Sequence, residues 1–140
     1  MQFKIRAANK EDCKEISRMI MELAVYEKMP DQVKISHEEL ERDGFCQNPF
    51  FECLVAEVPE HHKSREGNGI GKSLLSKVAE VGNQKGCVRL QLSVLNWNTP
   101  TRDFYAAKGA QDLTDSEGWH FIRFDGQNLE NLVNEAPKDE

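Results

Sequence analysis

A glycine-rich run in the middle of the chain is the feature that most directly suggests chemistry. The run consists of Gly67, Asn68, Gly69, Ile70, Gly71 and Lys72. An amphipathic helical pattern follows it. Bare backbone N–H groups at the start of a helix, together with the helix dipole, form a cradle for an anion such as a phosphate. The run therefore predicts an anion-binding site over residues 67–72, to which Lys72 would add a positive charge.

The run matches neither of the two common nucleotide-binding motifs. A dinucleotide-binding G-x-G-x-x-G motif that starts at Gly67 would require glycine where Lys72 stands. A G-x-x-x-x-G-K-S/T loop fits Gly71, Lys72 and Ser73, but its first position falls on Glu66, whose carboxylate repels phosphate. Both motifs follow an apolar strand, whereas residues 59–66 here form a charged loop. Nucleotide hydrolysis is therefore disfavoured.

Alternation and capping signals predict the elements that position the run. The predicted strands cover residues 3–6, 50–58, 88–94 and 119–124, and the predicted helices cover residues 9–27, 36–44, 70–86 and 98–109. Asn9 with Asp12 and Ser36 with Glu39 have the spacing of helix capping boxes. This order predicts an α/β sheet with helices packed on its faces.

Length and charge limit the class of protein. A chain of 140 residues suits a single domain with a core. Its net charge of −6 argues against nucleic acid as the main partner and is compatible with a cationic substrate. No apolar run approaches the ~20 residues of a membrane span. Residues 1–6 alternate like a strand and do not resemble a signal peptide, so we expect a cytoplasmic protein.

The cysteines and histidines give no metal-binding pattern. Cys13, Cys46, Cys53 and Cys87 lack C-x-x-C spacing, and we expect reduced thiols, several of them buried. His61 and His62 are adjacent and would point in opposite directions on a strand, with no third ligand nearby. We therefore expect no metal.

The rest of the chain favours a third interpretation of the run. Gly69 and Gly71 fit the small positions of the acyl-CoA loop, Q/R-x-x-G-x-G/A, of the GNAT superfamily of N-acetyltransferases. Residues 50–57, 97–100, 104–105, 108–110 and 117–119 occur in the order seen in its diamine acetyltransferases. Residues 109–114 and 119–121 are most similar to the thialysine branch. The resemblance extends from Lys4 to about Phe124.

The resemblance implies a fold whose sheet lacks its two central strands. Members of the family carry an additional block between the positions of Gly67 and Asn68, with room for two strands and their turn. We therefore expect one GNAT-like domain over residues 1–133, with a mixed sheet flanked by helices but without the central strand pair, and a polar tail over residues 134–140. Glu66 stands where the family's loop begins with a cation, and Arg65 is displaced by one position.

The resemblance also implies a reaction, in which an amine attacks the thioester of acetyl-CoA. Tyr105 matches the catalytic tyrosine, which would protonate the leaving thiolate. The residues expected to bind acetyl-CoA are Gly67, Asn68, Gly69, Ile70, Gly71, Lys72, Asn98, Thr99, Pro100 and Thr101. The residues expected to bind the amine of a polyamine or of thialysine are Tyr26, Glu27, Gln91, Leu92, Ser93, Glu117 and Trp119.

Each assignment has a plainer alternative, and one catalytic part is missing. Tyr105 could be a core aromatic residue beside Phe104, Asn98 a helix cap, and the glycine run an ordinary turn. In the family, the general base lies on the missing central strand. Neither Glu52 nor Glu57 is expected to replace it, because both belong to another strand. The alternative function is a catalytically inactive, shortened isoform that binds a full-length partner or is unstable. Unpaired strand edges favour a homodimer or a heterodimer with such a relative.

Overall fold

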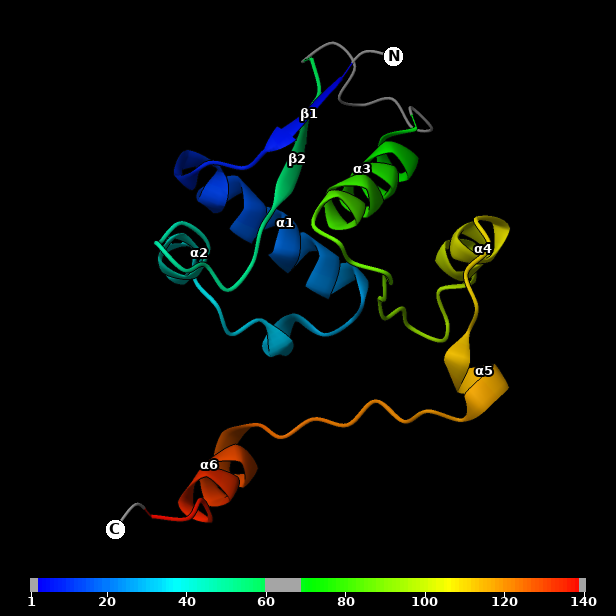
Figure 1. The fold of residues 1–140 in the computed structure, drawn as a ribbon. Helices are drawn as coiled ribbons and strands as arrows, with labels where there is room; N and C mark the ends of the chain where they lie inside the picture. The colour runs from blue at the N-terminus through cyan, green and yellow to red at the C-terminus, as the bar shows by residue number, and fades with distance from the viewer. Residues whose placement is uncertain (1–2, 60–68, 139–140) are drawn as a thin grey trace. The chain divides into compact units, whose positions relative to one another are not determined.

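The structure is a computed structural model that describes residues 3–59 and 69–138. Its backbone divides into two compact units, Met1–Ser93 and Val94–Glu140 (Figure 1). The predictions for Gly67, Asn68 and the pair His61 and His62 lie outside the described residues. Within the described ranges, no helix combines the length and the apolar character needed to cross a bilayer.

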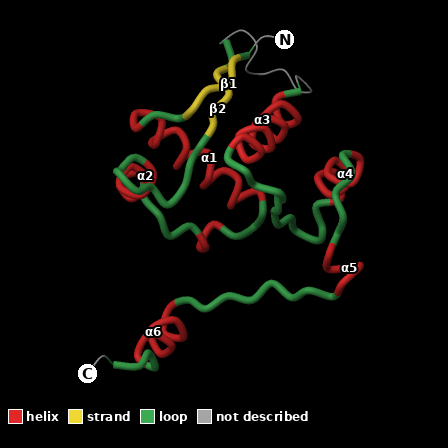
Figure 2. Tube along the Cα trace, in the orientation of Figure 1, coloured by secondary structure: helices red, strands yellow, loops and turns green. Residues whose placement is uncertain are grey.

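The first unit contains a sheet of two antiparallel strands (Figure 2). Strand β1 covers Lys4–Ala7 and strand β2 covers Leu54–Glu57. Lys4 lies opposite Glu57 and Ala7 lies opposite Leu54. β2 is shorter than the strand predicted over residues 50–58, although the main-chain N–H of Ala8 extends the pairing by donating to the carbonyl of Cys53 at 2.8 Å.

One arginine links the sheet to the first helix. Arg6 in β1 donates two hydrogen bonds to the Asp12 carboxylate, at 2.7 and 3.0 Å, and forms an ion pair of 3.2 Å with Glu57 in β2. Asp12 ends the short 3-10 helix η1 (Lys10–Asp12), and its Oδ2 also accepts the Asn9 N–H at 2.7 Å. The predicted capping box is therefore present. It leads directly into α1 (Cys13–Tyr26).

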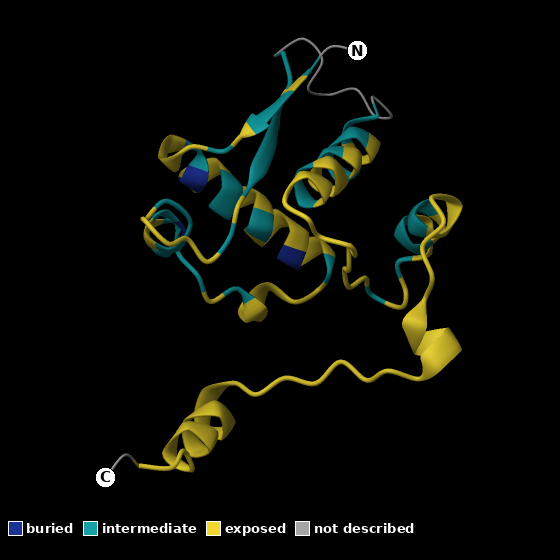
Figure 3. Cartoon of the chain, viewed as in Figure 1, coloured by how far each residue is buried: buried dark blue, intermediate teal, exposed yellow. Residues whose placement is uncertain are grey.

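The most buried side chains lie on α1 and α2 (Figure 3). They are Cys13, Ala24 and Leu40. Helix α2 (His37–Gly44) follows the 3-10 helix η2 (Pro30–Gln32) and begins at Ser36, whose Oγ accepts the Glu39 N–H at 3.1 Å, as its capping box predicts. Gly44 packs against Phe51, and a Cβ there would lie 2.3 Å from the Phe51 ring, so the ring would have to move.

Helix α3 covers Ile70–Gln84 and contacts β2 (Figure 1). The predicted glycine stop is present, since Gly86 has a left-handed φ of 86°. Of the predicted apolar stripe, Val78 is 42% exposed, and the helix contains no fully buried residue. An ion pair of 3.3 Å between Lys85 and Glu52 joins the end of this helix to the segment before β2. Helix α3 is thus held alongside the sheet.

The second unit contains three helices among its described residues. They are α4 (Thr99–Ala107), α5 (Leu113–Glu117) and α6 (Gly126–Asn134). The prediction located α4 correctly. It missed α5, although Asp112 caps that helix by accepting the N–H groups of Thr114 and Asp115 at 3.1 and 3.4 Å. It also missed α6.

Two strand predictions are wrong. Residues 88–94 and 119–124 have no strand structure, and their apolar side chains are exposed, with Val88 at 92% and Phe121 at 83%. A strand needs a neighbour to accept and donate its backbone hydrogen bonds. In the described residues the only ladder joins β1 and β2, so neither segment has such a neighbour. Residues 88–94 do alternate apolar and polar side chains, but among the described residues they have no strand to pair with.

Candidate functional site

The start of α3 has the properties of an anion-binding helix terminus. Gly69 is the N-cap and has a left-handed φ of 74°. The Ser73 N–H closes the first turn onto the Gly69 carbonyl at 3.0 Å. The N–H groups that precede Ser73 in the helix have no intrahelical acceptor. No acidic residue lies in the first turn, so no carboxylate there neutralises the positive end of the dipole.

Gly71 leaves the first turn open. A Cβ built on it would meet no atom within 4 Å, so the neighbouring residues do not require glycine here. Glycine in a helix is costly relative to alanine, and a close approach of a ligand to the backbone would explain it. Lys72 follows with an exposed side chain. The described part of the predicted cradle, Gly69 to Lys72, therefore suits a phosphate group.

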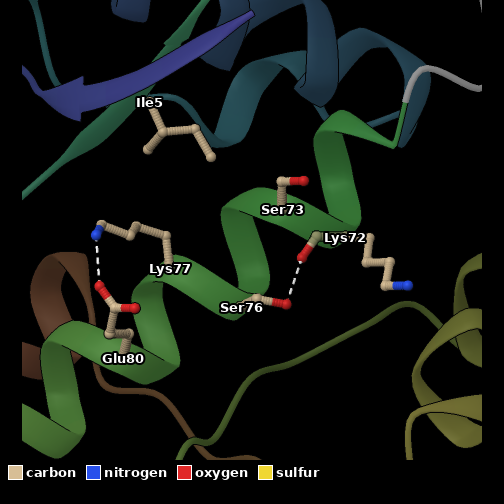
Figure 4. Close-up of a pocket in the computed structure, with 6 residues that line it drawn as sticks. All are labelled: Ile5, Lys72, Ser73, Ser76, Lys77 and Glu80. Atoms are coloured by element: carbon tan, nitrogen blue, oxygen red, sulfur yellow. Dashed lines mark hydrogen bonds and ion pairs between the residues drawn. The ribbon is translucent and has the colours of Figure 1, made fainter. Parts of the chain in front are cut away.

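A groove of about 260 Å³ lies between this helix and β1 (Figure 4). Ile5 forms its apolar side, and polar residues of α3 form the other. Lys77 pairs with Glu80 within the groove, and the Ser76 hydroxyl donates to the Lys72 carbonyl at 2.8 Å. These polar groups already bind one another, so the groove adds little to the anion site at the helix start.

Helix α4 carries the predicted tyrosine. Asn98 caps it by accepting the Thr101 N–H at 3.4 Å, and Pro100 lies in its first turn. Tyr105 is half-buried, and its ring meets that of Phe104 edge-on with centroids 5.4 Å apart. Asn98 therefore does cap the helix, and the Tyr105 ring packs against that of Phe104.

Arg102 links two elements of the second unit, and the sequence analysis did not predict this link. From α4 it donates to the Asn96 carbonyl at 3.1 Å and to Asp112 at 3.3 Å, and it lies 3.8 Å from Asp115. It therefore joins the segment before α4 to the cap of α5. No motif marks this residue in the sequence, since its partners lie up to thirteen positions away.

The end of α5 places two predicted residues in contact. Gly118, with a left-handed φ of 74°, turns the chain directly after Glu117. The Trp119 indole N–H then donates to the Glu117 carboxylate at 2.8 Å. Trp119 remains 64% exposed. An aromatic face beside a carboxylate is suited to bind an ammonium group.

The other predicted amine-binding residues lie on separate parts of the first unit. Tyr26 ends α1 and is 57% exposed, and Glu27 is the C-cap of the same helix. Gln91, Leu92 and Ser93 lie in the exposed segment without regular secondary structure that follows α3. The candidate amine-binding residues therefore form three groups, which lie at the end of α1, after α3 and at the end of α5.

The four cysteines form no disulfide, and burial lowers the reactivity of two of them. Cys13 is buried and Cys53 half-buried, whereas Cys46 and Cys87 are exposed. Burial raises the pKa of the Cys13 thiol and that of Cys53, which disfavours the reactive thiolate. The described residues contain no group of three potential metal ligands.

Comparison with known proteins identifies the family. The family model described as acetyltransferase (GNAT) matches residues 61–110. The thialysine N-epsilon-acetyltransferase of Bos taurus is 41% identical over 167 aligned residues, which cover 92% of this chain and 96% of the relative. The chain belongs to the GNAT family of N-acetyltransferases. Acetyl-CoA is the acetyl donor of this family, and the open helix start of α3 fits its pyrophosphate.

Other relatives extend the comparison within the GNAT family. The thialysine N-epsilon-acetyltransferase of Mus musculus is 41% identical, over 93% of this chain and 96% of its own length. A spermidine/spermine N(1)-acetyltransferase-like protein of Homo sapiens is 32% identical, over 91% of this chain but 23% of its own length. An integron cassette protein from V. cholerae shares the fold, with a TM-score of 0.65, 20% identity, and coverage of 95% of this chain and 98% of its own. The α/β acetyltransferase fold is thus present.

Proposed function

We propose that this chain transfers the acetyl group of acetyl-CoA to a primary amine of thialysine or of a polyamine. The likeness to thialysine enzymes over nearly the whole chain carries the proposal. The open N-terminus of α3 supports it physically, because unpaired N–H groups without a nearby acid favour a pyrophosphate. We further propose that residues 1–133 act as one catalytic domain in the cytoplasm.

Each group of residues has a role in this proposal. The first turn of α3, with Gly67 and Asn68 before it, binds the pyrophosphate, and residues 98–101 at the start of α4 contact the rest of acetyl-CoA. The neutral amine attacks the thioester carbonyl carbon, the C–S bond breaks, and Tyr105 gives its hydroxyl proton to the leaving sulfur and regains a proton from water. The amine loses its extra proton to water. Tyr26, Glu27, Gln91, Leu92, Ser93, Glu117 and Trp119 hold the amine.

No carboxylate of β2 serves as general base in this proposal. Glu57 is paired with Arg6 at 3.2 Å, and Glu52, just before the strand, is paired with Lys85 at 3.3 Å. One oxygen of each carboxylate is therefore already engaged by a cation. We therefore expect the rate to rise with pH, because the fraction of neutral amine rises.

The length of the alignment and the exposed segment 88–94 favour a second, non-catalytic function. The alignment to the cattle enzyme spans more residues than this chain contains, which supports the loss of an internal segment. Residues 88–94 alternate apolar and polar side chains but pair with no strand of residues 3–59 or 69–138, and Leu90 is 50% and Leu92 47% exposed. Such a segment can pair with another chain. We propose as the alternative a shortened, inactive form that pairs with itself or with a full-length relative.

Calorimetric titration with acetyl-CoA separates the two functions. The catalytic proposal expects binding with a dissociation constant in the micromolar range, abolished by excess CoA. The alternative expects no heat from acetyl-CoA, but a mixed dimer in sedimentation when the cattle enzyme is added. Absence of acetyl-CoA binding would therefore exclude catalysis by this chain.

A further inference from the structure

The hydrogen-bond pattern between β1 and β2 determines which backbone groups of β2 point away from β1 (Figure 2). The Ala8 N–H donates to the Cys53 carbonyl at 2.8 Å, and Ala7 lies opposite Leu54 in the same register. In an antiparallel pair, hydrogen-bonded and non-hydrogen-bonded residue pairs alternate along the strands. The N–H and C=O groups of Leu54 and Ala56 therefore point to the outer edge of β2, the edge that faces away from β1.

This outer edge has no backbone partner among residues 3–59 and 69–138. No main-chain group of these residues bonds to Leu54 or Ala56, and the Leu54 carbonyl accepts a thiol contact from Cys53 at 3.7 Å. Unpaired N–H and C=O groups at a strand edge can be satisfied by the backbone of an added strand. The outer edge of β2 can therefore receive one.

Residues 88–94 have the pattern of such an added strand. Val88, Leu90 and Leu92 alternate with polar residues, and all three are exposed. Within the part of the chain that the structure describes, no main-chain hydrogen bond involves residues 88–94. The segment contains neither glycine nor proline, which would weaken a strand. It can thus supply the donors and acceptors that the edge of β2 lacks.

Charge favours β2 over β1 as the receiving strand. The segment 88–94 carries one charge, that of the exposed Arg89, and no carboxylate. Residues 52–58, which include β2, carry two glutamates and no cation, whereas residues 3–8, which include β1, carry two cations and no acid. The segment is therefore attracted to the edge of β2 and repelled by that of β1.

The negative charge beside β2 is not fully neutralised. The Arg6 guanidinium contacts both Asp12 and Glu57, at 2.7 and 3.2 Å. One cation therefore serves two carboxylates. Arg89 forms no ion pair with a described residue and can supply a second cation when its segment lies on β2.

The turn after α3 directs the segment away from the β2 of its own chain. The Gly86 N–H donates to the Asn83 carbonyl at 3.0 Å, and the Cys87 N–H donates to the Gly82 carbonyl at 2.9 Å. With the turn held in this way, residues 88–94 are not paired with their own β2. A second copy presents the same edge without this constraint, and exchange between two copies is reciprocal.

We propose that the outer edge of β2, formed by Leu54 and Ala56, receives residues 88–94 of a second copy of this chain, so that each copy gives one strand and receives one. The inference deepens the alternative function, self-pairing of a shortened form, on which it rests. It names the surface that receives the segment. It does not depend on acetyl transfer.

Ala56→Pro tests the edge while sparing the β1–β2 ladder, because the Ala56 N–H points away from β1. Proline removes this donor, and its ring obstructs an incoming strand. We expect the association constant of A56P to fall at least about tenfold in sedimentation velocity. Ala7→Pro removes an outward N–H from the edge of β1 and is the matched control, which should associate as the wild type does.

The outcomes separate the inference from the function on which it rests. If the wild type stays monomeric, self-pairing and the inference both fail. If the wild type associates and A56P associates equally, self-pairing stands and the inference is overturned. A mixture of A56P, which keeps the segment, with L90K, which keeps the edge, should form a dimer with one exchanged strand. Absence of this mixed dimer would contradict the exchange.

Hydrogen exchange on the wild type tests the same edge without a substitution. The amides of Leu54 and Ala56 should become at least about tenfold more protected as the protein concentration rises, whereas those of Ile5 and Ala7 should not. Protection that is independent of concentration would mean that the segment of the same chain occupies the edge. Absence of protection would mean that the edge stays free. Either result overturns the inference.

Discussion

The indole N–H of Trp119 donates a hydrogen bond of 2.8 Å to the carboxylate of Glu117. Gly118 makes this contact possible, because its φ of 74° folds the chain back after α5. The bond fixes an aromatic ring beside a negative charge on an exposed surface. In the proposed function this pair receives the far ammonium group of the substrate.

Trp119→Phe should therefore weaken amine binding without unfolding the protein. The ring remains, but the Glu117 carboxylate loses the donor that orients it. We expect the KM for the amine to rise about threefold to tenfold with little change in kcat, since an exposed charge-assisted hydrogen bond contributes ~1 kcal/mol. Phe121→Leu, at another exposed aromatic residue, is the control. Equal KM values for wild type and W119F would contradict the assignment.

Gly71→Ala should change stability and ligand binding in opposite directions. Alanine at a helical position that has open space around it stabilises the helix by up to ~1 kcal/mol, so the thermal midpoint should rise. The new Cβ would stand between the backbone and the pyrophosphate, and the affinity for acetyl-CoA should fall about tenfold or more.

Gly82→Ala in the same helix is the matched control for G71A. Its Cβ would meet only the Cys87 side chain, at an ordinary distance of 3.6 Å. This variant should gain stability and keep its affinity for acetyl-CoA. If G71A binds acetyl-CoA as well as G82A does, the helix start is not the cradle.

The Arg6–Asp12 pair should make stability depend on acid pH. The Arg6 hydrogen bonds hold the pKa of Asp12 at about 2, below its ordinary value of 3.8. Its contribution is therefore fully present above about pH 4 and is lost as the pH falls through 2. Urea unfolding at a series of pH values should show this decline in the wild type.

Asp12→Asn should flatten the decline, because an amide does not titrate, and should lower stability at neutral pH, because the ion pair with Arg6 is lost. Glu15→Gln, which breaks the exposed pair with Arg18, should cost less than about 0.5 kcal/mol. A pH profile that is the same in D12N and wild type would show that the pair does not set it.

Residues 88–94 should cause self-association. Their apolar side chains are exposed, and the segment has no partner strand in the described residues. Leu90→Lys places a charge on the apolar side of the alternation and should weaken association at least about tenfold in sedimentation velocity. Gln91→Lys adds the same charge on the polar side and should weaken it less. A wild-type chain that stays monomeric at tens of micromolar would contradict this prediction.

Capping residues and helix-ending glycines in the sequence predicted the helices that carry them. Asn9, Ser36 and Asn98 each precede a helix, and Gly86 and Gly109 each end one. These signals act within one turn, so they need no knowledge of the rest of the chain. Asp112 caps α5 in the same way, and its position in the sequence is a comparable signal.

Strand pairing and contacts between distant side chains could not be predicted from such local signals. The alternation in residues 88–94 is that of a strand, but a strand forms only against a neighbour, and the described chain provides none. Likewise, no pattern reveals that Arg102 binds Asp112 or that Trp119 binds Glu117. Resemblance to the family located the candidate site residues, and their roles rest on it.

The most direct test of the central claim is mass-spectrometric detection of acetylthialysine after incubation of the chain with acetyl-CoA and thialysine. We predict product in proportion to enzyme concentration, and a rate at least ~10²-fold lower for Tyr105→Phe, with acetyl-CoA affinity unchanged. Absence of product above the uncatalysed rate, or an equal rate for Tyr105→Phe, would contradict the proposed acetyl transfer.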